Sequence, residues 1–208
     1  MAKRKTAALE LPPFPPLTRG EFHWEGRVKL PAWAGFQSRQ GAYAGRNSKK
    51  KSDGTVRVSI AVEDDEPAEH QPTPEQAEAF RYLLKHQKQI RDAILAAVFD
   101  EYPTARQNYA GDFDIEDEKE LAKVLPVLKR PAELKAVIGL STIHLSPVVL
   151  ARQAYLGFEF GCNWEEEHGL GVLIHSGRVA AVGHADVCFL EWVAEDDAKK
   201  QGRKARKK

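Results

Sequence analysis

The densest group of chemically versatile side chains lies at residues 162–172, which read Cys-Asn-Trp-Glu-Glu-Glu-His-Gly-Leu-Gly-Val. Three adjacent carboxylates followed by an imidazole could bind a metal ion, act as a general acid and base, or accept hydrogen bonds from their own loop. A solvated loop with its tryptophan packed on the core is the plainer alternative. The candidate binding residues are Trp164, Glu165, Glu166, Glu167, His168 and Asp186.

Metal-ligand residues are numerous around this stretch, but their spacing fits no zinc motif. Neither C-x-x-C nor H-E-x-x-H occurs, and Cys162 is expected to point into an apolar layer. We therefore predict no metal and no cofactor. The ligand-type residues considered are Cys162, His168, His175, His184, Asp186 and Cys188.

Other catalytic motifs are missing from the sequence. It has no G-x-S-x-G nucleophile motif, and Gly169-x-Gly171 lacks the third glycine of a dinucleotide-binding loop. The sequence leaves open whether the protein is an enzyme, and the lack of these motifs favours a protein that is not one.

The candidate stretch joins segments that read as β-strands. Ser176-Gly177 is a two-residue connection of the kind that closes an antiparallel hairpin, so Ile174 should face Val179 and Val172 should face Ala181. The strands predicted in this half of the chain are residues 137–145, 155–162, 170–175 and 178–183.

Two more strands are predicted near the N-terminus. Residues 22–30 and 55–62 alternate apolar and polar side chains, as half-buried strands do. We expect them to pair as a hairpin whose long polar tip, residues 37–53, is mobile.

A long helix has the clearest local signals. Thr73 is the expected N-cap, Pro74 suits the first helical position, and Gln76 completes a capping box. The helix is predicted to end at Tyr102 because Pro103 lacks a backbone N–H. The residues of its apolar stripe are Phe80, Leu83, Leu84, Ile90, Ile94, Ala97 and Val98.

These elements predict an α+β fold, a mostly antiparallel sheet with one long amphipathic helix packed on it. Residues 1–20 carry four of the twelve prolines and are expected to form an extended lead-in on the surface. Residues 21–195 are predicted to form one domain. Residues 196–208 are expected to be a basic, disordered tail.

Charge is distributed unevenly along the 208 residues, although the formal net charge is only +1. Of the 31 Lys and Arg residues, 10 lie at the termini, at residues 3–5 and 199–208. The remaining 21 face 30 Asp and Glu residues, so the body carries a net charge of about −9. This predicts an acidic domain with basic ends.

Localisation is predicted to be cytoplasmic, with no membrane association. No apolar run is long enough to span a bilayer, and the prolines that follow Leu11 interrupt any signal-peptide core.

The sequence also resembles a bacterial family of uncharacterised domains with a C-x-W-[DE]-E-E-H-G-x-G-V signature. In this chain Glu165 occupies a place often taken by Asp. Some similar domains lie near secreted-toxin gene clusters, which implies an immunity-like role. The resemblance rests on Trp24, residues 30–36, the helix ending at Tyr102, residues 157–173, Arg178-Val179 and residues 183–186.

The leading functional hypothesis is a non-catalytic domain that binds a basic protein partner, because an acidic body steers such partners toward it. One alternative is a metal-assisted hydrolase using residues 165–168 of the loop. A second is weak nucleic-acid contact through the C-terminal Lys/Arg run. Partner identity and oligomeric state are not predicted.

Overall fold

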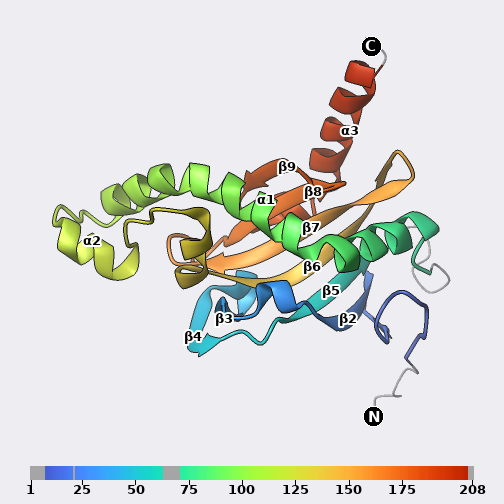
Figure 1. Ribbon diagram of the computed structural model, residues 1–208, viewed down its shortest axis with the longest axis horizontal. Coiled ribbons are helices and arrows are strands. Elements are labelled where there is room, and N and C mark those ends of the chain that lie inside the picture. Colours follow the sequence, from blue (N-terminus) through green and yellow to red (C-terminus); the bar gives the residue numbers. More distant parts are fainter. Residues whose placement is uncertain (1–7, 21, 63–70, 206–208) are drawn as a thin grey trace.

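The computed structural model describes residues 8–20, 22–62 and 71–205, and its main feature is one large sheet (Figure 1). The strands are β1 (Thr18–Arg19), β2 (His23–Lys29), β3 (Gln37–Gln40), β4 (Arg46–Lys51), β5 (Thr55–Ala61), β6 (Ile138–Leu150), β7 (Gln153–Cys162), β8 (Leu170–His175) and β9 (Arg178–Gly183). The helices are α1 (Pro74–Asp112), α2 (Glu118–Val124) and α3 (Glu191–Ala205). The 3-10 turns are η1 (Pro31–Trp33), η2 (Ala42–Ala44), η3 (Pro131–Ala136) and η4 (Ala185–Cys188).

The large sheet has the strand order β1-β2-β5-β6-β7-β8-β9. Every neighbouring pair in it is antiparallel except β5 and β6, whose connection contains α1. The predicted α+β class, with a mostly antiparallel sheet and one long helix, is confirmed.

The β8–β9 hairpin forms at the predicted connection. Ile174 lies opposite Val179 as expected, but Val172 lies opposite Val182 instead of Ala181. A register shift between Leu173 and Ile174 inserts one extra residue, which alternation alone does not reveal.

The β2–β5 pairing is also confirmed, with Trp24 opposite Ile60. Its connection was expected to be a mobile tip, and that expectation was wrong. Residues 37–51 instead form the two-stranded β3–β4 sheet, whose base closes with a hydrogen bond from Ser52 N to Phe36 O.

Helix α1 begins as predicted. Thr73 Oγ1 accepts from Gln76 N at 3.2 Å, and Gln76 Oε1 accepts from Thr73 N at 2.9 Å, so the capping box is complete. The Gln76 amide also donates to Ala61 O at 2.7 Å, which ties the start of the helix to the end of β5.

The predicted end of α1 at Tyr102 was wrong, because the helix continues through Pro103 to Asp112. Tertiary contacts compensate for the hydrogen bond that proline removes. Tyr102 is buried and donates to Pro126 O, and Arg106 donates to Leu125 O and pairs with Glu118 at the start of α2.

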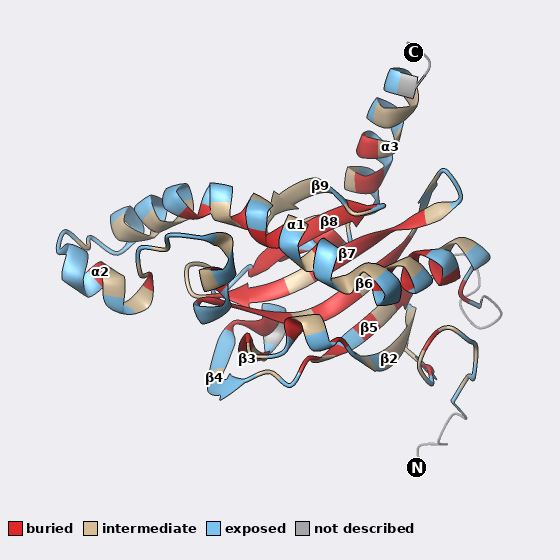
Figure 2. Cartoon of the chain, in the orientation of Figure 1, coloured by how far each residue is buried: buried red, intermediate tan, exposed pale blue. Residues whose placement is uncertain are grey.

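The core lies between α1 and one face of the sheet. Figure 2 shows the sheet mostly buried beneath α1, whose outer side is exposed. Trp33 packs between Phe36, Phe158 and Phe160 with ring centroids 5.1–6.1 Å apart. Of the predicted apolar stripe, Phe80, Leu83, Ile90, Ile94 and Val98 are buried, whereas Leu84 is 36% exposed.

The opposite face of the sheet is covered closely at two glycines of β7. A Cβ at Gly161 would overlap Ala44 O of η2, and a Cβ at Gly157 would overlap Cys188 O of η4. Glycine on β7 therefore lets backbone rest directly on the sheet at both sites.

The N-terminal segment is part of the core, contrary to its expected surface position. Phe14 and Leu17 are buried, Phe14 packs on Phe80, and Leu9 bridges to Leu17. The basic residues 3–5 and residue 21 lie outside the described residues.

The C-terminal segment was expected to be disordered from residue 196, but α3 runs to Ala205 and projects from the sheet (Figure 1). Asp197 anchors it by pairing with Arg178 and accepting from Tyr155 Oη at 2.8 Å, while Ala194 is buried beside Tyr155. Residues 206–208 lie outside the described residues.

We predict that Ile94→Ala lowers the free energy of unfolding by about 3 kcal/mol, because it leaves a cavity between α1 and the sheet. Urea denaturation would measure this change. Leu84→Ala, on the exposed side of the same helix, is the control and should cost less than about 1 kcal/mol. Equal losses would contradict the packing of this face.

We predict that Asp197→Asn lowers the free energy of unfolding by about 2 kcal/mol. The loss is smaller than for a fully buried ion pair, because solvent screens Arg178, which is 42% exposed. Although burial acts to raise the pKa of Asp197, hydrogen bonds from Arg178 and Tyr155 hold it below its usual value. A lowered native pKa stabilises the fold above the unfolded pKa, and the gain is lost as the pH falls through the native pKa.

Thermal unfolding between neutral and acidic pH would therefore show the two proteins converging at low pH. Asp196→Asn, an exposed neighbour, is the control and should match the unmodified protein throughout. A constant gap at every pH would contradict the assignment.

Candidate functional site

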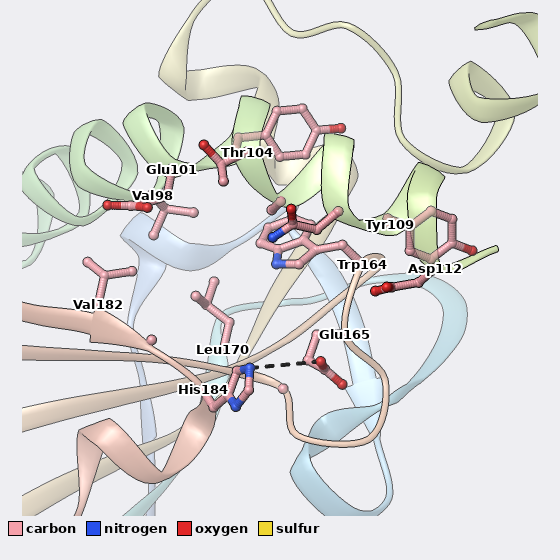
Figure 3. A pocket seen from close by; sticks show the side chains of 15 residues that line it. Val98, Glu101, Thr104, Tyr109, Asp112, Trp164, Glu165, Leu170, Val182 and His184 are labelled. Carbon is pink, nitrogen blue, oxygen red and sulfur yellow. Dashed lines mark ion pairs between the residues drawn. The ribbon is translucent and has the colours of Figure 1, made fainter. Parts of the chain in front are cut away.

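A cleft of about 380 Å³ lies between the second half of α1, the loop after β7 and the end of β9. Figure 3 shows Trp164 and Glu165 facing the α1 residues Tyr109 and Asp112, with Leu170 and His184 nearby. The lining residues used below are Glu101, Tyr102, Tyr109, Asp112, Trp164, Glu165 and His184.

Trp164 and Tyr102 form the aromatic base of this cleft. Their rings meet edge to face with centroids 5.4 Å apart, a favourable aromatic geometry. Burial raises the pKa of Tyr102 to about 12, so its hydroxyl stays protonated and donates to Pro126 O at 2.9 Å. The base of the cleft is therefore held rigidly.

Glu165 organises the candidate loop. Its Oε1 accepts from the backbone N–H of Glu167 at 3.2 Å and of His168 at 3.1 Å, and lies 3.2 Å from His168 Nδ1. Burial acts to raise the pKa of Glu165, but the hydrogen bonds from His168 and Glu167 outweigh it and lower that pKa. The carboxylate is thus charged at neutral pH and closes the turn.

Two histidines flank Glu165. His184 Nε2 lies 3.9 Å from Glu165 Oε2, and the His168 and His184 rings stack with centroids 5.1 Å apart and planes at 14°. Within residues 8–20, 22–62 and 71–205, no three His, Cys, Asp or Glu side chains come together as metal ligands would.

The sequence-predicted residues are only partly brought together. Trp164 and Glu165 line the cleft, whereas Glu166, Glu167 and His168 are exposed on the outside of the loop. Asp186 is exposed at the start of η4, and this segment reaches the loop through a hydrogen bond from Ala185 N to His168 O at 3.0 Å.

Helix α1 contributes site residues that the sequence reasoning missed. Glu101, Tyr109 and Asp112 line the cleft, yet the predicted end of the helix excluded the last two from it. The available signal was the spacing of Glu101, Asn108 and Asp112, which repeats on one helical face.

The cleft is acidic as well as aromatic. Glu101, Asp112 and Glu165 line it, and among the described residues no Lys or Arg does. Concentrated negative charge beside aromatic faces favours a cationic group.

A buried arginine, also missed in the sequence, supports the base of the loop. Arg39 donates to Asn163 Oδ1, Gly45 O and Gln37 Oε1, and the Asn163 amide donates to Val124 O at 2.9 Å. This network joins β3, the end of α2 and the residue before Trp164, so it orients the loop.

The cysteines are not activated nucleophiles. Cys162 and Cys188 are free and buried, and Cys162 lies in the apolar core as expected. Burial raises the pKa of Cys162 to about 12 and that of Cys188 further still, so both remain thiols at neutral pH.

Fold and cleft together define an α+β domain with an acidic, aromatic recess beside its long helix. The chain belongs to the DUF6985 family, a domain of unknown function whose model matches residues 24–190. This match confirms the predicted membership in a family of uncharacterised domains. Neither the curated proteins nor the solved structures contain a match. No helix in the described residues has the length and apolar character to cross a membrane.

We predict that Glu165→Ala accelerates amide hydrogen exchange at residues 167 and 168 by about fivefold, because each N–H loses its acceptor. Exchange measured by NMR would report this. Glu167→Ala is the control, since its side chain is exposed and accepts none of these bonds. Unchanged exchange in Glu165→Ala would show that the carboxylate does not hold the turn.

Proposed function

We propose that this domain is a non-catalytic cytoplasmic protein that binds a basic segment of a partner protein in the cleft beside α1. The observation that supports it is the combination of three carboxylates with the Trp164 and Tyr109 rings in one recess without a lining Lys or Arg, among the described residues. Its volume of about 380 Å³ suits one or two inserted side chains.

The charges favour a Lys or Arg side chain as the inserted group. Glu101 and Asp112 lie about three turns apart on α1, and Glu165 lies on the opposing loop, so basic side chains along the cleft would find acids on both elements. Charge-assisted hydrogen bonds to carboxylates are stronger than neutral ones. An aromatic face adds a cation–π contribution.

The exposed part of the loop extends this surface. Glu166 and Glu167 face solvent beside the cleft, where they would add long-range attraction more than affinity. An immunity-like role, in which the bound partner is a basic toxin, is the specific form of the proposal that the family resemblance suggests.

Nucleic-acid contact through the basic C-terminal run is the second candidate that we propose. Helix α3 presents Lys199, Lys200, Arg203 and Lys204, and its Trp192 is 61% exposed. Such a surface would bind phosphates with strong salt dependence.

We predict that selection from a random-sequence peptide library on the immobilised protein enriches peptides containing Lys or Arg. The double variant Glu101→Gln/Asp112→Asn should bind a selected peptide about tenfold more weakly, because it removes two lining charges. Fluorescence polarisation of the labelled peptide would measure the dissociation constants.

The control is Asp100→Asn/Glu116→Gln, which removes the same charge from exposed positions outside the cleft and should change affinity by less than about twofold. Enrichment of acidic peptides, or equal effects of the two double variants, would overturn the proposal. Tight, salt-dependent binding of duplex DNA with no peptide enrichment would favour the α3 alternative instead.

A further inference from the structure

A second, polar pocket lies on the face of the sheet opposite α1. It has a volume of about 370 Å³ and is bounded by the β3–β4 sheet and by β2, β5, β6 and β7. Its polar and charged lining residues are Arg27, Ser38, Arg39, Gln40, Ser52, Thr55, Arg57, Ser141 and Glu159.

Two arginines lie side by side in the lining of this pocket. Arg27 on β2 is the direct cross-strand partner of Arg57 on β5, and both are exposed. Like charges opposite one another destabilise a sheet. Neither guanidinium makes an ion pair or hydrogen bond with another described residue, although Arg57 acts electrostatically on Glu159.

A third arginine adds buried charge. Arg39 is 8% exposed, and its hydrogen-bond acceptors are the neutral oxygens of Gln37, Gly45, Val137 and Asn163. Burying a cation is costly. Glu166 attracts Arg39 electrostatically but accepts no hydrogen bond from it, so an anion in the adjoining pocket would reduce the remaining cost.

The nearby carboxylates are engaged by other groups. Glu159 lies 2.8 Å from His144 Nε2 and accepts from Ser141 Oγ at 3.2 Å. Glu25 lies 2.8 Å from His23 Nε2, and Asp53 accepts from Thr55 N and Oγ1 at 2.9 and 3.0 Å.

A strand irregularity brings Ser141 to the pocket. The pairing of β6 with β7 shifts between Leu140 and Thr142, so Ser141 is the extra residue. Such bulges redirect a side chain and are frequent beside functional sites. The lining also holds the hydroxyls of Ser38 and Ser52, whereas those of Ser141 and Thr55 already donate to Glu159 and Asp53.

We propose that this pocket binds a small anionic ligand through a phosphoryl or carboxylate group held by Arg27 and Arg57. The planar guanidinium presents donors in a fork that matches such oxygens. The volume admits a molecule of nucleotide size. The site is separate from the acidic cleft and does not depend on the function proposed for it.

Isothermal titration calorimetry of the full chain with inorganic phosphate, adenosine monophosphate and succinate would test this. We expect saturable binding of at least one of the three probes, with phosphate or the nucleotide indicating a phosphoryl ligand and succinate alone a carboxylate one. Arg27→Gln/Arg57→Gln should weaken that binding by tenfold or more.

The matched control is Arg81→Gln/Arg130→Gln, which removes two exposed arginines outside this lining and should leave binding unchanged. Circular dichroism would confirm that both double variants fold. If the pocket variant does not fold, Arg57→Lys replaces it. This variant keeps the positive charge but loses the forked donors of the guanidinium, so it should still weaken binding. Absence of saturable binding for all three probes, or equal loss in the control, would overturn the proposal.

Discussion

Burial of the apolar stripe of α1 against one face of the sheet is the constraint on which the other features depend. Ile90, Ile94 and Val98 are almost fully buried there, and Trp33 with the β7 phenylalanines fills the layer beneath. Removal of this apolar area from water is the largest favourable contribution available to a chain of this size. Because the apolar stripe of α1 packs on one face of the sheet, polar side chains lie at the ends of the helix and on the opposite face of the sheet.

The acidic cleft exists because α1 is longer than its apolar stripe. The turns beyond Pro103 are held by Arg106 and Tyr102 against the segment around Leu125, and their polar side then stands opposite the loop after β7. If the helix ended at Tyr102, the loop after β7 would face solvent, and the cleft lined by Asp112 and Glu165 would not form.

The two pockets differ in charge. The cleft beside α1 is lined by three carboxylates, whereas the pocket beside β3–β4 is lined by three arginines and one carboxylate. Arg39 connects the two regions, because it lines the second pocket and also orients Asn163 at the base of the candidate loop. Substitutions in this network should therefore be examined for effects on both sites.

Local patterns in the sequence determined much of the fold. Alternation located β2, β5, β8 and β9, and the capping box located the start of α1, because both depend on neighbours within a few residues. Trp164 and Glu165 were likewise recognisable as candidate residues from one short stretch.

Only the tertiary structure decided where α1 ends, that residues 196–205 are helical, and which residues share a site. These outcomes depend on contacts between distant segments, such as Arg106 with Leu125 and Asp197 with Arg178. The sequence predicted that β2 and β5 pair, but the register that sets Arg27 opposite Arg57, thirty positions away, came only from the structure. Contacts between distant segments can offset the free-energy cost of a proline in a helix or of two facing cations. Local propensity reflects that cost but not the contacts that offset it.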